Sequence, residues 1–295
     1  RLDKLKKALE YFDIQTCMPN YILIVDNAST DETYEYLQMW KKSKRKYEKI
    51  LIRKSKNSGG SGGFYTGLTE AVKKDADWIW VSDDDAYPEK NALKYVNEYL
   101  EQHKNEKIAA VCGTVMNQNK IDIGHRRRIY TKIFRIKEKS VPEYEYGKSE
   151  FEINEFSYVG VVMNKEALKR MGVTNKNYFI HYDDTEHSLR LGKYGTILCI
   201  PQVIITHDTK VLSDQIEYNN SWQKYYDYRN LLDMYRRHFP KRYYLFQLCI
   251  YKIKLMLPQL FNISKEHRMI LKEAVKDVER HQLGMHPKYR PNNKK

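Results

Sequence analysis

The sequence predicts an α/β fold in which a mostly parallel sheet carries flanking helices and is followed by a helical C-terminal region. Short apolar runs such as 21–25 and 108–112 alternate with helical patterns of ten or more residues. This alternation is typical of strands that are buried on both faces by helices. From about residue 217 the pattern is helical, with no further strand-like run. We therefore expect two parts, residues 1–215 and residues 216–295.

The elements of the first part follow directly from these patterns. We expect a helix at 3–12, a strand at 21–25, a helix from about 31, a strand at 49–53, a helix after the glycines of 57–63, a strand at 78–81, a helix at 89–102 and a strand at 108–112. In the first helix Leu5, Leu9 and Phe12 recur at helical spacing. Ser29 or Thr30 can cap the second helix.

The stretch 117–155 differs from the rest, because it is polar, basic and rich in tyrosine. We expect it to form an irregular excursion or a hairpin at the edge of the sheet. Regular structure resumes at 156–162 and in a helix from Asn164.

Composition limits the class of protein. The chain has 295 residues, of which 41% are hydrophobic, and this is enough for a sizeable core. Its four cysteines are scattered, so we expect neither a disulfide framework nor a zinc site, and a reducing compartment such as the cytoplasm is favoured. No segment reaches the ~20 apolar residues of a membrane span. The net charge of +14 indicates an anionic partner, which could be a nucleotide, a nucleic acid or an acidic membrane surface.

The most informative motif is the strand 78–81 that leads into Asp83, Asp84 and Asp85. Clustered carboxylates repel one another unless a cation neutralises them. Oxygen ligands at a strand end suit a hard divalent ion such as Mg²⁺ or Mn²⁺, which also binds phosphate. The alternative is an acidic turn that caps the following helix.

Two other features fall at strand ends. Asp26 closes the strand 21–25, and the glycine-rich loop 57–63 follows the strand 49–53 and leads into a helix. Such glycines allow backbone N–H groups to approach a phosphate at a helix N-terminus. In α/β sheets ligands bind beyond the carboxyl ends of the strands. Asp26, the loop and Asp83 to Asp85 should therefore converge on one site, although Asp26 could instead cap a helix.

Five motifs together resemble glycosyltransferase family 2. They are 25–31 (VDNASTD), 57–63 (NSGGSGG), 83–85 (DDD), 181–190 (HYDDTEHSLR) and 225–230 (YYDYRN), and they occur in the order of the family within roughly residues 1–232. The resemblance is greatest to bacterial galactofuranosyl- and rhamnosyltransferases of cell-surface polysaccharide synthesis. It implies a GT-A-like fold, and also a β-strand before Arg1 that this sequence lacks. Because the chain opens with Arg1, we expect its natural N-terminus to be missing.

The resemblance also implies roles on the donor side. Asp26 would bind the nucleobase or ribose, and Asn57, Gly59, Gly60 and Gly63 would lie against the nucleotide sugar. Asp83 would bind the ribose or phosphate side and the metal, Asp84 would orient either, and Asp85 would bind Mn²⁺ or Mg²⁺. His207 follows a strand and is a candidate further metal ligand, although a lone histidine is more often structural.

On the acceptor side the resemblance makes Asp184 the general base. Asp183 or Glu186 would bind acceptor hydroxyls or hold Arg190, four residues after Glu186 on the same helical face. The alternative is an acidic first turn stabilised by the helix dipole. Trp222 is a candidate to stack on a sugar ring, although ordinary packing is the alternative.

Two basic regions have open interpretations. The run Arg126, Arg127 and Arg128 could contact the donor diphosphate or an anionic acceptor, or could be a solvated charge run. The apolar segment 243–257 has basic flanks and fits a helix in the membrane interface, a helix packed on the domain, or a homo-oligomer interface.

The sequence thus predicts an inverting, metal-dependent glycosyltransferase that moves a sugar from a UDP- or dTDP-sugar donor, such as one of galactofuranose or rhamnose, to a glycan hydroxyl. The acceptor is expected to be a glycan or a lipid-linked glycan, with peripheral contact to an anionic membrane as one hypothesis. A nucleotidyltransferase would need an early basic signature loop, which is not found. The other alternative is a nucleic-acid- or anion-binding protein that uses its basic surface, although no nucleic-acid motif is found and no nucleic acid is expected.

Overall fold

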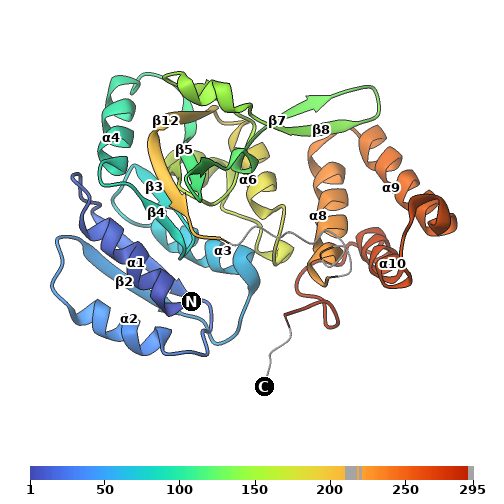
Figure 1. Ribbon diagram of the computed structural model, residues 1–295, viewed down its shortest axis with the longest axis horizontal. Coiled ribbons are helices and arrows are strands. Elements are labelled where there is room, and N and C mark those ends of the chain that lie inside the picture. The colour runs from blue at the N-terminus through green and yellow to red at the C-terminus, as the bar shows by residue number, and fades with distance from the viewer. Residues whose placement is uncertain (210–217, 219–220, 292–295) are drawn as a thin grey trace.

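The computed structural model describes residues 1–209, 218 and 221–291. A sheet with helices on both sides forms the larger part, and three long helices lie beside it (Figure 1). The helices are α1 (Leu2–Asp13), α2 (Thr33–Lys42), α3 (Gly59–Ala71), α4 (Ala92–Gln102), α5 (Lys165–Met171), α6 (Asp183–Leu191), α8 (Gln223–His238), α9 (Lys241–Met256) and α10 (Lys265–Glu279). Single 3₁₀ turns are η1 (Ile123–His125), η2 (Glu143–Gly147), η3 (Lys176–Tyr178) and η4 (Pro258–Phe261).

The strands are β1 (Tyr21–Asp26), β2 (Glu48–Arg53), β3 (Trp78–Val81), β4 (Ala86–Pro88), β5 (Ile108–Asn117), β6 (Lys120–Ile121), β7 (Arg126–Thr131), β8 (Ile136–Ser140), β9 (Phe151–Glu152), β10 (Glu155–Phe156), β11 (Val161–Asn164) and β12 (Thr196–His207). The four strands predicted at 21–25, 49–53, 78–81 and 108–112 are confirmed as β1, β2, β3 and the first half of β5, and further strands are present. The helix expected at 89–102 begins only at Ala92.

The main sheet has the strand order β3-β11-β5-β12-β4 and is mixed. Strands β3, β5 and β12 run in one direction, because β11 is antiparallel to both β3 and β5 while β12 is parallel to β5. Strand β4 is antiparallel to β12. The α/β class is confirmed, and the sheet contains more antiparallel pairing than the apolar runs suggested. An apolar run predicts a buried strand, but it does not predict whether the neighbouring strand in the sheet is parallel or antiparallel to it.

Strands β1 and β2 pair in parallel as a separate two-stranded sheet. A cavity of about 1510 Å³ runs between β1 and β3 and is lined by apolar residues of both, such as Leu23 and Trp80. The strand that the resemblance implies before Arg1 stays a prediction.

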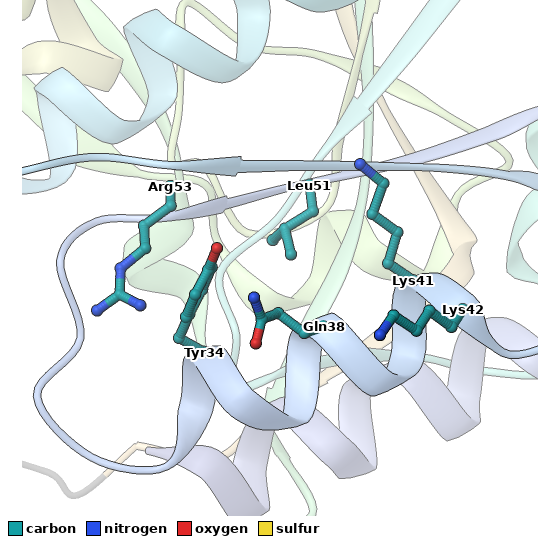
Figure 2. Close-up of a pocket in the computed structure, with 6 residues that line it drawn as sticks. All are labelled: Tyr34, Gln38, Lys41, Lys42, Leu51 and Arg53. Carbon is teal, nitrogen blue, oxygen red and sulfur yellow. The ribbon is translucent and has the colours of Figure 1, made fainter.

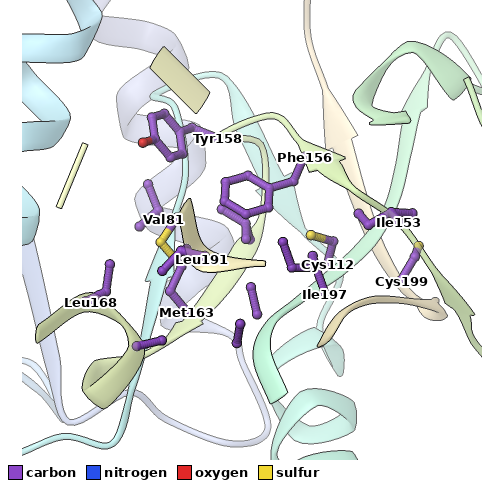
Figure 3. Packing of buried hydrophobic residues seen from close by; sticks show 14 of the residues in the cluster. Val81, Cys112, Ile153, Phe156, Tyr158, Met163, Leu168, Leu191, Ile197 and Cys199 are labelled. Atoms are coloured by element: carbon purple, nitrogen blue, oxygen red, sulfur yellow. The ribbon is translucent and has the colours of Figure 1, made fainter. Parts of the chain in front are cut away.

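The core lies on both faces of the main sheet. Alternate residues of β5 point to opposite sides, so Ala110 and Cys112 join one apolar cluster while Val111 joins another. The first cluster packs against helices through Leu168 of α5 and Leu191 of α6 (Figure 3). The second packs against α4. Because the first eight residues of β5 are all buried, β5 is the central strand that the continuous apolar run predicted.

The stretch 117–155 contains the expected hairpin. Strands β7 and β8 pair from Arg127 with Ser140 to Thr131 with Ile136, and β10 extends this sheet on the other side of β7. The hairpin projects from the main sheet toward the C-terminal helices (Figure 1).

The C-terminal helices pack against the sheet domain. Tyr225 and Tyr226 of α8 and Leu271 of α10 share an apolar cluster with Phe179, which lies just before α6. The expected boundary between residues 215 and 216 lies outside the described residues, so the division into two parts stays a prediction. No helix in the described part of the chain is both long and apolar enough to cross a membrane.

Candidate active site

The three consecutive aspartates form the turn between β3 and β4. Strand β12 ends beside them, because His207 pairs in register with Ala86 of β4. The His207 Nε2 atom lies 3.4 Å from Asp85 Oδ1. Ligand atoms of Asp83, Asp85 and His207 all lie within 4.8 Å of one another. Sheet pairing therefore brings together three residues that are up to 124 positions apart (207 − 83 = 124).

The charges of this turn are only partly balanced by protein cations. Arg1 Nη1 lies 2.7 Å from Asp84 Oδ1 and 3.1 Å from Asp85 Oδ2, and Lys4 Nζ lies 3.4 Å from Asp85 Oδ2. Burial raises the pKa of Asp85, but the hydrogen bond and charge of His207 together with Arg1 and Lys4 outweigh it and lower that pKa. Burial and the charges of Asp85 and Asp84 raise the pKa of Asp83 to about 7.

These residues fit a divalent metal ion. Two carboxylates and an imidazole suit Mn²⁺, and Mg²⁺ accepts the same carboxylates. The His207 Nδ1 atom is buried and has no hydrogen-bond partner among the described residues. Burial, and after it the charges of Asp85 and Asp84, disfavour the ionised form of Asp83, and a bound cation would favour that form.

The glycine-rich loop forms the first turn of α3. Asn27, directly after β1, holds it: Asn27 Nδ2 donates to Gly59 O at 2.9 Å, and Asn27 Oδ1 accepts from Ser58 N at 3.1 Å. Gly59 has a φ of +72°, and a Cβ at this position would lie 2.0 Å from Phe179 O. A Cβ on Gly60 meets nothing within 4 Å. The sequence analysis assigned no role to Asn27. Its position within the 25–31 motif was the only indication that it contributes to the site.

Asp26 orders the turn that follows β1. Its Oδ1 accepts from Ser29 N at 2.9 Å. Its Oδ2 is buried without a hydrogen-bond partner among the described residues, and Arg53 Nε lies 3.6 Å away. Helix α2 begins further on, after Glu32, so Asp26 does not cap it. The role of Asp26 in binding the donor stays a prediction.

Most of the predicted donor-side residues share one cavity. The cavity of about 1510 Å³ between β1 and β3 extends past their ends and is lined there by Asp26, Asn57, Gly59, Gly60, Gly63, Asp83 and Asp84. Trp222, which was predicted on the acceptor side, also lines it, whereas Asp85 and His207 do not. Trp222 also packs on Phe179, with ring centroids 6.3 Å apart. The tertiary structure therefore brings these predicted residues together, as expected for strand ends of one crevice.

A smaller cavity of about 480 Å³ lies between α2 and β2 (Figure 2). Lys41, Lys42 and Arg53 line it, and the Arg53 guanidinium stacks 3.7 Å from the centroid of the Tyr34 ring. No carboxylate lines this cavity, so it lacks the acid–base groups of the larger one.

The second acidic cluster begins α6. Asp183 is buried, and burial together with the charge of Asp184 raises its pKa to about 7. Asp184 is partly exposed, and its Oδ1 accepts from Thr185 N at 2.7 Å. Ser61 of the glycine loop donates its N–H to Phe179 O at 3.2 Å, so the loop and the turn before α6 are in direct contact.

Glu186 makes a structural ion-pair network. It accepts from Arg190 Nη2 at 2.9 Å and lies 2.8 Å from His238 Nε2 of α8. These partners lower the pKa of Glu186 to about 2 although burial acts in the opposite direction. Of the two roles expected for Glu186, the geometry favours the one that holds Arg190.

The turn before α6 has an unusual backbone. Phe179, His181 and Tyr182 all have φ values between 61° and 68°, a region that is costly for residues with side chains. Asn230 of α8 holds this turn, because its Nδ2 donates to the carbonyls of Tyr178, Ile180 and His181 at 2.8 to 3.0 Å. The motif 225–230 thus supports the acidic cluster from the C-terminal helices.

The three consecutive arginines have three different environments. Arg126 is fully buried and donates to the carbonyls of Gly113 and Val159. Arg127 pairs with Glu155 at 2.9 Å and donates to Thr185 Oγ1, and Arg128 binds Glu145 with two nitrogens. The interpretation as a solvated charge run is therefore wrong for Arg126, because alternation along β7 sends neighbouring side chains to opposite faces.

Comparison with known proteins identifies the family of this chain. Residues 2–171 match the family model of Glycosyl transferase family 2. The chain therefore belongs to glycosyltransferase family 2, which confirms the family and the enzyme class expected from the motifs.

Among its relatives is the galactofuranosyltransferase GlfT1 of Mycobacterium tuberculosis, 24% identical over 66% of this chain and 62% of that protein. The match thus spans less than two thirds of this relative. The dTDP-rhamnosyl transferase RfbF of Shigella flexneri is 25% identical over 74% of this chain and 71% of its own length.

Solved structures confirm the GT-A-like fold. TarS of S. aureus in complex with UDP-GlcNAc has a TM-score of 0.58 at 14% identity, over 93% of this chain and 76% of that one. The mannosyltransferase PcManGT of Pyrobaculum calidifontis, in complex with GDP-Man and Mn²⁺, has a TM-score of 0.56 at 13% identity, over 95% and 84%.

Proposed function

We propose that this protein is an inverting, metal-dependent glycosyltransferase that moves a sugar from a nucleotide-diphosphate donor to a hydroxyl of a glycan in cell-surface polysaccharide synthesis. The observation that carries the proposal is one cavity that joins the end of β1, the glycine loop and the acidic turn, with the start of α6 in contact with that loop. UDP- and dTDP-sugars, such as those of galactofuranose and rhamnose, are the first donors to test because of the two relatives named above.

The donor end follows from the chemistry of the residues. Asp26 lies at the end of the cavity where the nucleoside would bind, and the start of α3, with its open space at Gly60, would accept the diphosphate. Asp83, Asp85 and His207 would hold Mn²⁺ or Mg²⁺. The ion would neutralise the charge that develops on the leaving nucleoside diphosphate.

At the acceptor end we assign the general base to Asp184. As the acceptor oxygen attacks the anomeric carbon, Asp184 takes the hydroxyl proton, and the bond from that carbon to the diphosphate oxygen breaks with both electrons leaving on the nucleotide. Asp184 is the partly exposed member of the pair, whereas the pKa of the buried Asp183 is raised to about 7. Asp183 and Trp222 are proposed to contact the acceptor.

We place the reaction in the cytoplasm. All four cysteines are free, including Cys112 and Cys199, which lie opposite each other in neighbouring strands. Unpaired cysteines at adjacent positions fit a reducing compartment. Fractionation of cells that carry the tagged protein tests this placement.

The first test is thermal unfolding with UDP, dTDP and GDP, each with and without Mn²⁺, and with EDTA as the control for metal. We expect one nucleotide to raise the melting temperature only when Mn²⁺ is present. Asp85→Asn should lose this metal-dependent shift. Absence of any shift with all three nucleotides would contradict the donor site.

The second test separates the base from donor binding. Asp184→Asn is expected to lower transfer from the stabilising nucleotide sugar to a panel of octyl glycosides by at least about 100-fold, because it removes the proton acceptor. Its nucleotide-dependent thermal shift should equal that of the unsubstituted protein. Normal transfer by Asp184→Asn would show that another group is the base.

A further inference from the structure

The far end of the molecule from α1 and α2 carries exposed apolar side chains from three elements. They are Ile133 and Phe134 in the loop between β7 and β8, Leu245, Ile253 and Met256 on α9, and Leu257, Leu260 and Phe261 in and beside η4. Ile133, Met256 and Leu260 are 76%, 67% and 75% exposed. We call this set the apolar end face.

Tertiary contacts make the apolar end face one surface. The Phe134 ring at the tip of the hairpin stacks on Phe246 of α9 with centroids 5.8 Å apart, and Arg135 lies 5.6 Å from the centroid of the same ring. Figure 1 shows the hairpin tip and α9 at the same end of the molecule. Helix η4 continues directly from α9.

Helix α9 is apolar on two sides. Tyr243, Leu248 and Tyr251 face the core, while Leu245, Ile253 and Met256 are exposed on the other side. Packing on the domain therefore accounts for only one side of this helix. Contiguous exposed apolar groups of this kind mark a surface that a partner covers.

The charges around the apolar end face are predominantly positive. No aspartate or glutamate occurs between Asp233 and Glu266, or between Asp122 and Glu138. Exposed cations on these stretches include Lys132, Arg135, Lys137, Lys241 and Arg242, whereas Lys252 is paired with Glu279 of α10 at 2.7 Å. Part of the net charge of +14 is thus gathered beside exposed aliphatic and aromatic groups.

We infer that the apolar end face binds the surface of an anionic lipid bilayer, with the apolar side chains in the headgroup region and the cations against lipid phosphates. Apolar groups beside an excess of basic ones are the pattern of interfacial binding. A second copy on a two-fold axis would instead place these like charges against each other. This inference does not depend on the proposed transfer reaction.

The apolar end face is linked to the proposed acceptor side of the active site through shared structural elements. The same hairpin carries Arg127 at its base, and Arg127 Nη2 donates to Thr185 Oγ1 next to Asp184. Helix α8, which precedes α9, holds the turn before α6 through Asn230. Lipid docking would therefore act on the elements that position the proposed acceptor side.

The test is flotation of the full chain with vesicles of phosphatidylcholine alone and of phosphatidylcholine with phosphatidylglycerol. We expect flotation with the anionic vesicles and its decline at high salt. The double variants Ile133→Ser/Phe134→Ser and Leu260→Ser/Phe261→Ser should each weaken binding at least about tenfold, because each removes two apolar side chains from the interface.

A matched control and a second readout keep the outcomes distinct. Met39→Ser removes a side chain that is 65% exposed on α2, so it should float like the unsubstituted protein. Thermal unfolding and nucleotide-dependent stabilisation of the double variants should be unchanged. No flotation at low salt, or equal flotation of the double variants, would overturn the inference. Light scattering would also overturn the inference if the unsubstituted protein were a dimer and the double variants were monomers. That result would identify a second copy of the chain as the partner.

Discussion

At the scale of single residues, the active site is a balance between carboxylates and the cations that neutralise them. Arg1 and Lys4 reach Asp84 and Asp85, but the pKa of Asp83 remains raised to about 7. The same contrast recurs at α6, where Asp183 has a raised pKa while Glu186, held by His238 and Arg190, has a lowered one. All these residues are acidic, but their neighbours differ. Carboxylates with nearby protein cations stabilise the fold, whereas those without enough cations are candidates to bind a ligand.

A buried histidine beside the site predicts sensitivity to acid. His187 Nδ1 lies 2.8 Å from Tyr158 Oη and Nε2 lies 3.1 Å from Gly172 O, and burial lowers the pKa of His187 to about 3. The unfolded chain binds a proton near pH 6.5 and the folded chain does not. The stability that this neutral histidine provides is thus complete above that pH and declines as the pH falls toward 3.

The measurement is the unfolding free energy of the unsubstituted protein and of His187→Gln between pH 7 and pH 5. At pH 5 we expect the unsubstituted protein to have lost about 2 kcal/mol more than the variant, since 1.5 pH units correspond to that energy. Parallel profiles of the two proteins would show that His187 is not the acid-sensitive group.

At the scale of elements, the glycine loop has one position fixed by the fold and one left open for a ligand. Gly59 is required by its positive φ and by the carbonyl of Phe179, whereas Gly60 has free space where a side chain would begin. The difference follows from the contact between the start of α3 and the turn before α6. Two glycines that look alike in the motif therefore have different physical roles.

The pair Gly59→Ala and Gly60→Ala tests this difference. Gly59→Ala is expected to lower the unfolding free energy by at least about 2 kcal/mol, because it combines an unfavourable φ with a backbone clash. Gly60→Ala should unfold like the unsubstituted protein but bind the nucleotide more weakly, because its methyl group occupies the space in front of the loop. Urea titration and calorimetric nucleotide binding measure the two effects. Equal stability of both variants would contradict the assignment to Gly59.

At the scale of the whole molecule, the C-terminal helices complete the acceptor side of the site. Asn230 and Arg229 of α8 donate to carbonyls of the strained turn 178–182, and α10 packs behind α8. The turn keeps its left-handed residues because a separate part of the chain satisfies its carbonyl groups. The position of the proposed base Asp184 therefore depends on helices that follow more than forty positions later (230 − 184 = 46).

Asn230→Ala is expected to destabilise the protein by about 2 to 4 kcal/mol, because it removes the Asn230 hydrogen bonds to the carbonyls of Ile180 and His181, while Tyr178 O keeps Arg229 as a donor. It should also lower the transfer rate more than donor binding, since the turn leads into Asp184. Exposed Asn105→Ala is the control. Denaturant unfolding and steady-state kinetics provide the measurements, and an unchanged transfer rate in a destabilised variant would limit Asn230 to a role in folding.

Much of this protein was determined by the sequence alone. The strands 21–25, 49–53, 78–81 and 108–112 were predictable from their short apolar runs, although only 108–112 is buried throughout and the other three are largely half-buried. The convergence of Asp26, the glycine loop and Asp83 to Asp85 followed from their places at strand ends. Local sequence is sufficient for such features, because each depends on the residues of one segment and on the geometry shared by all α/β sheets.

Only the tertiary structure decided the remaining features. The antiparallel insertion of β11, the burial of Arg126, the ion pairs of Glu186 and the support of the turn before α6 by Asn230 all join segments that lie far apart in the chain. The apolar end face likewise depends on the contact of the hairpin tip with α9. The direction of a strand relative to its neighbour, the burial of a side chain and the partner of a charged group all depend on how two distant segments pack. A single stretch of sequence therefore cannot predict them.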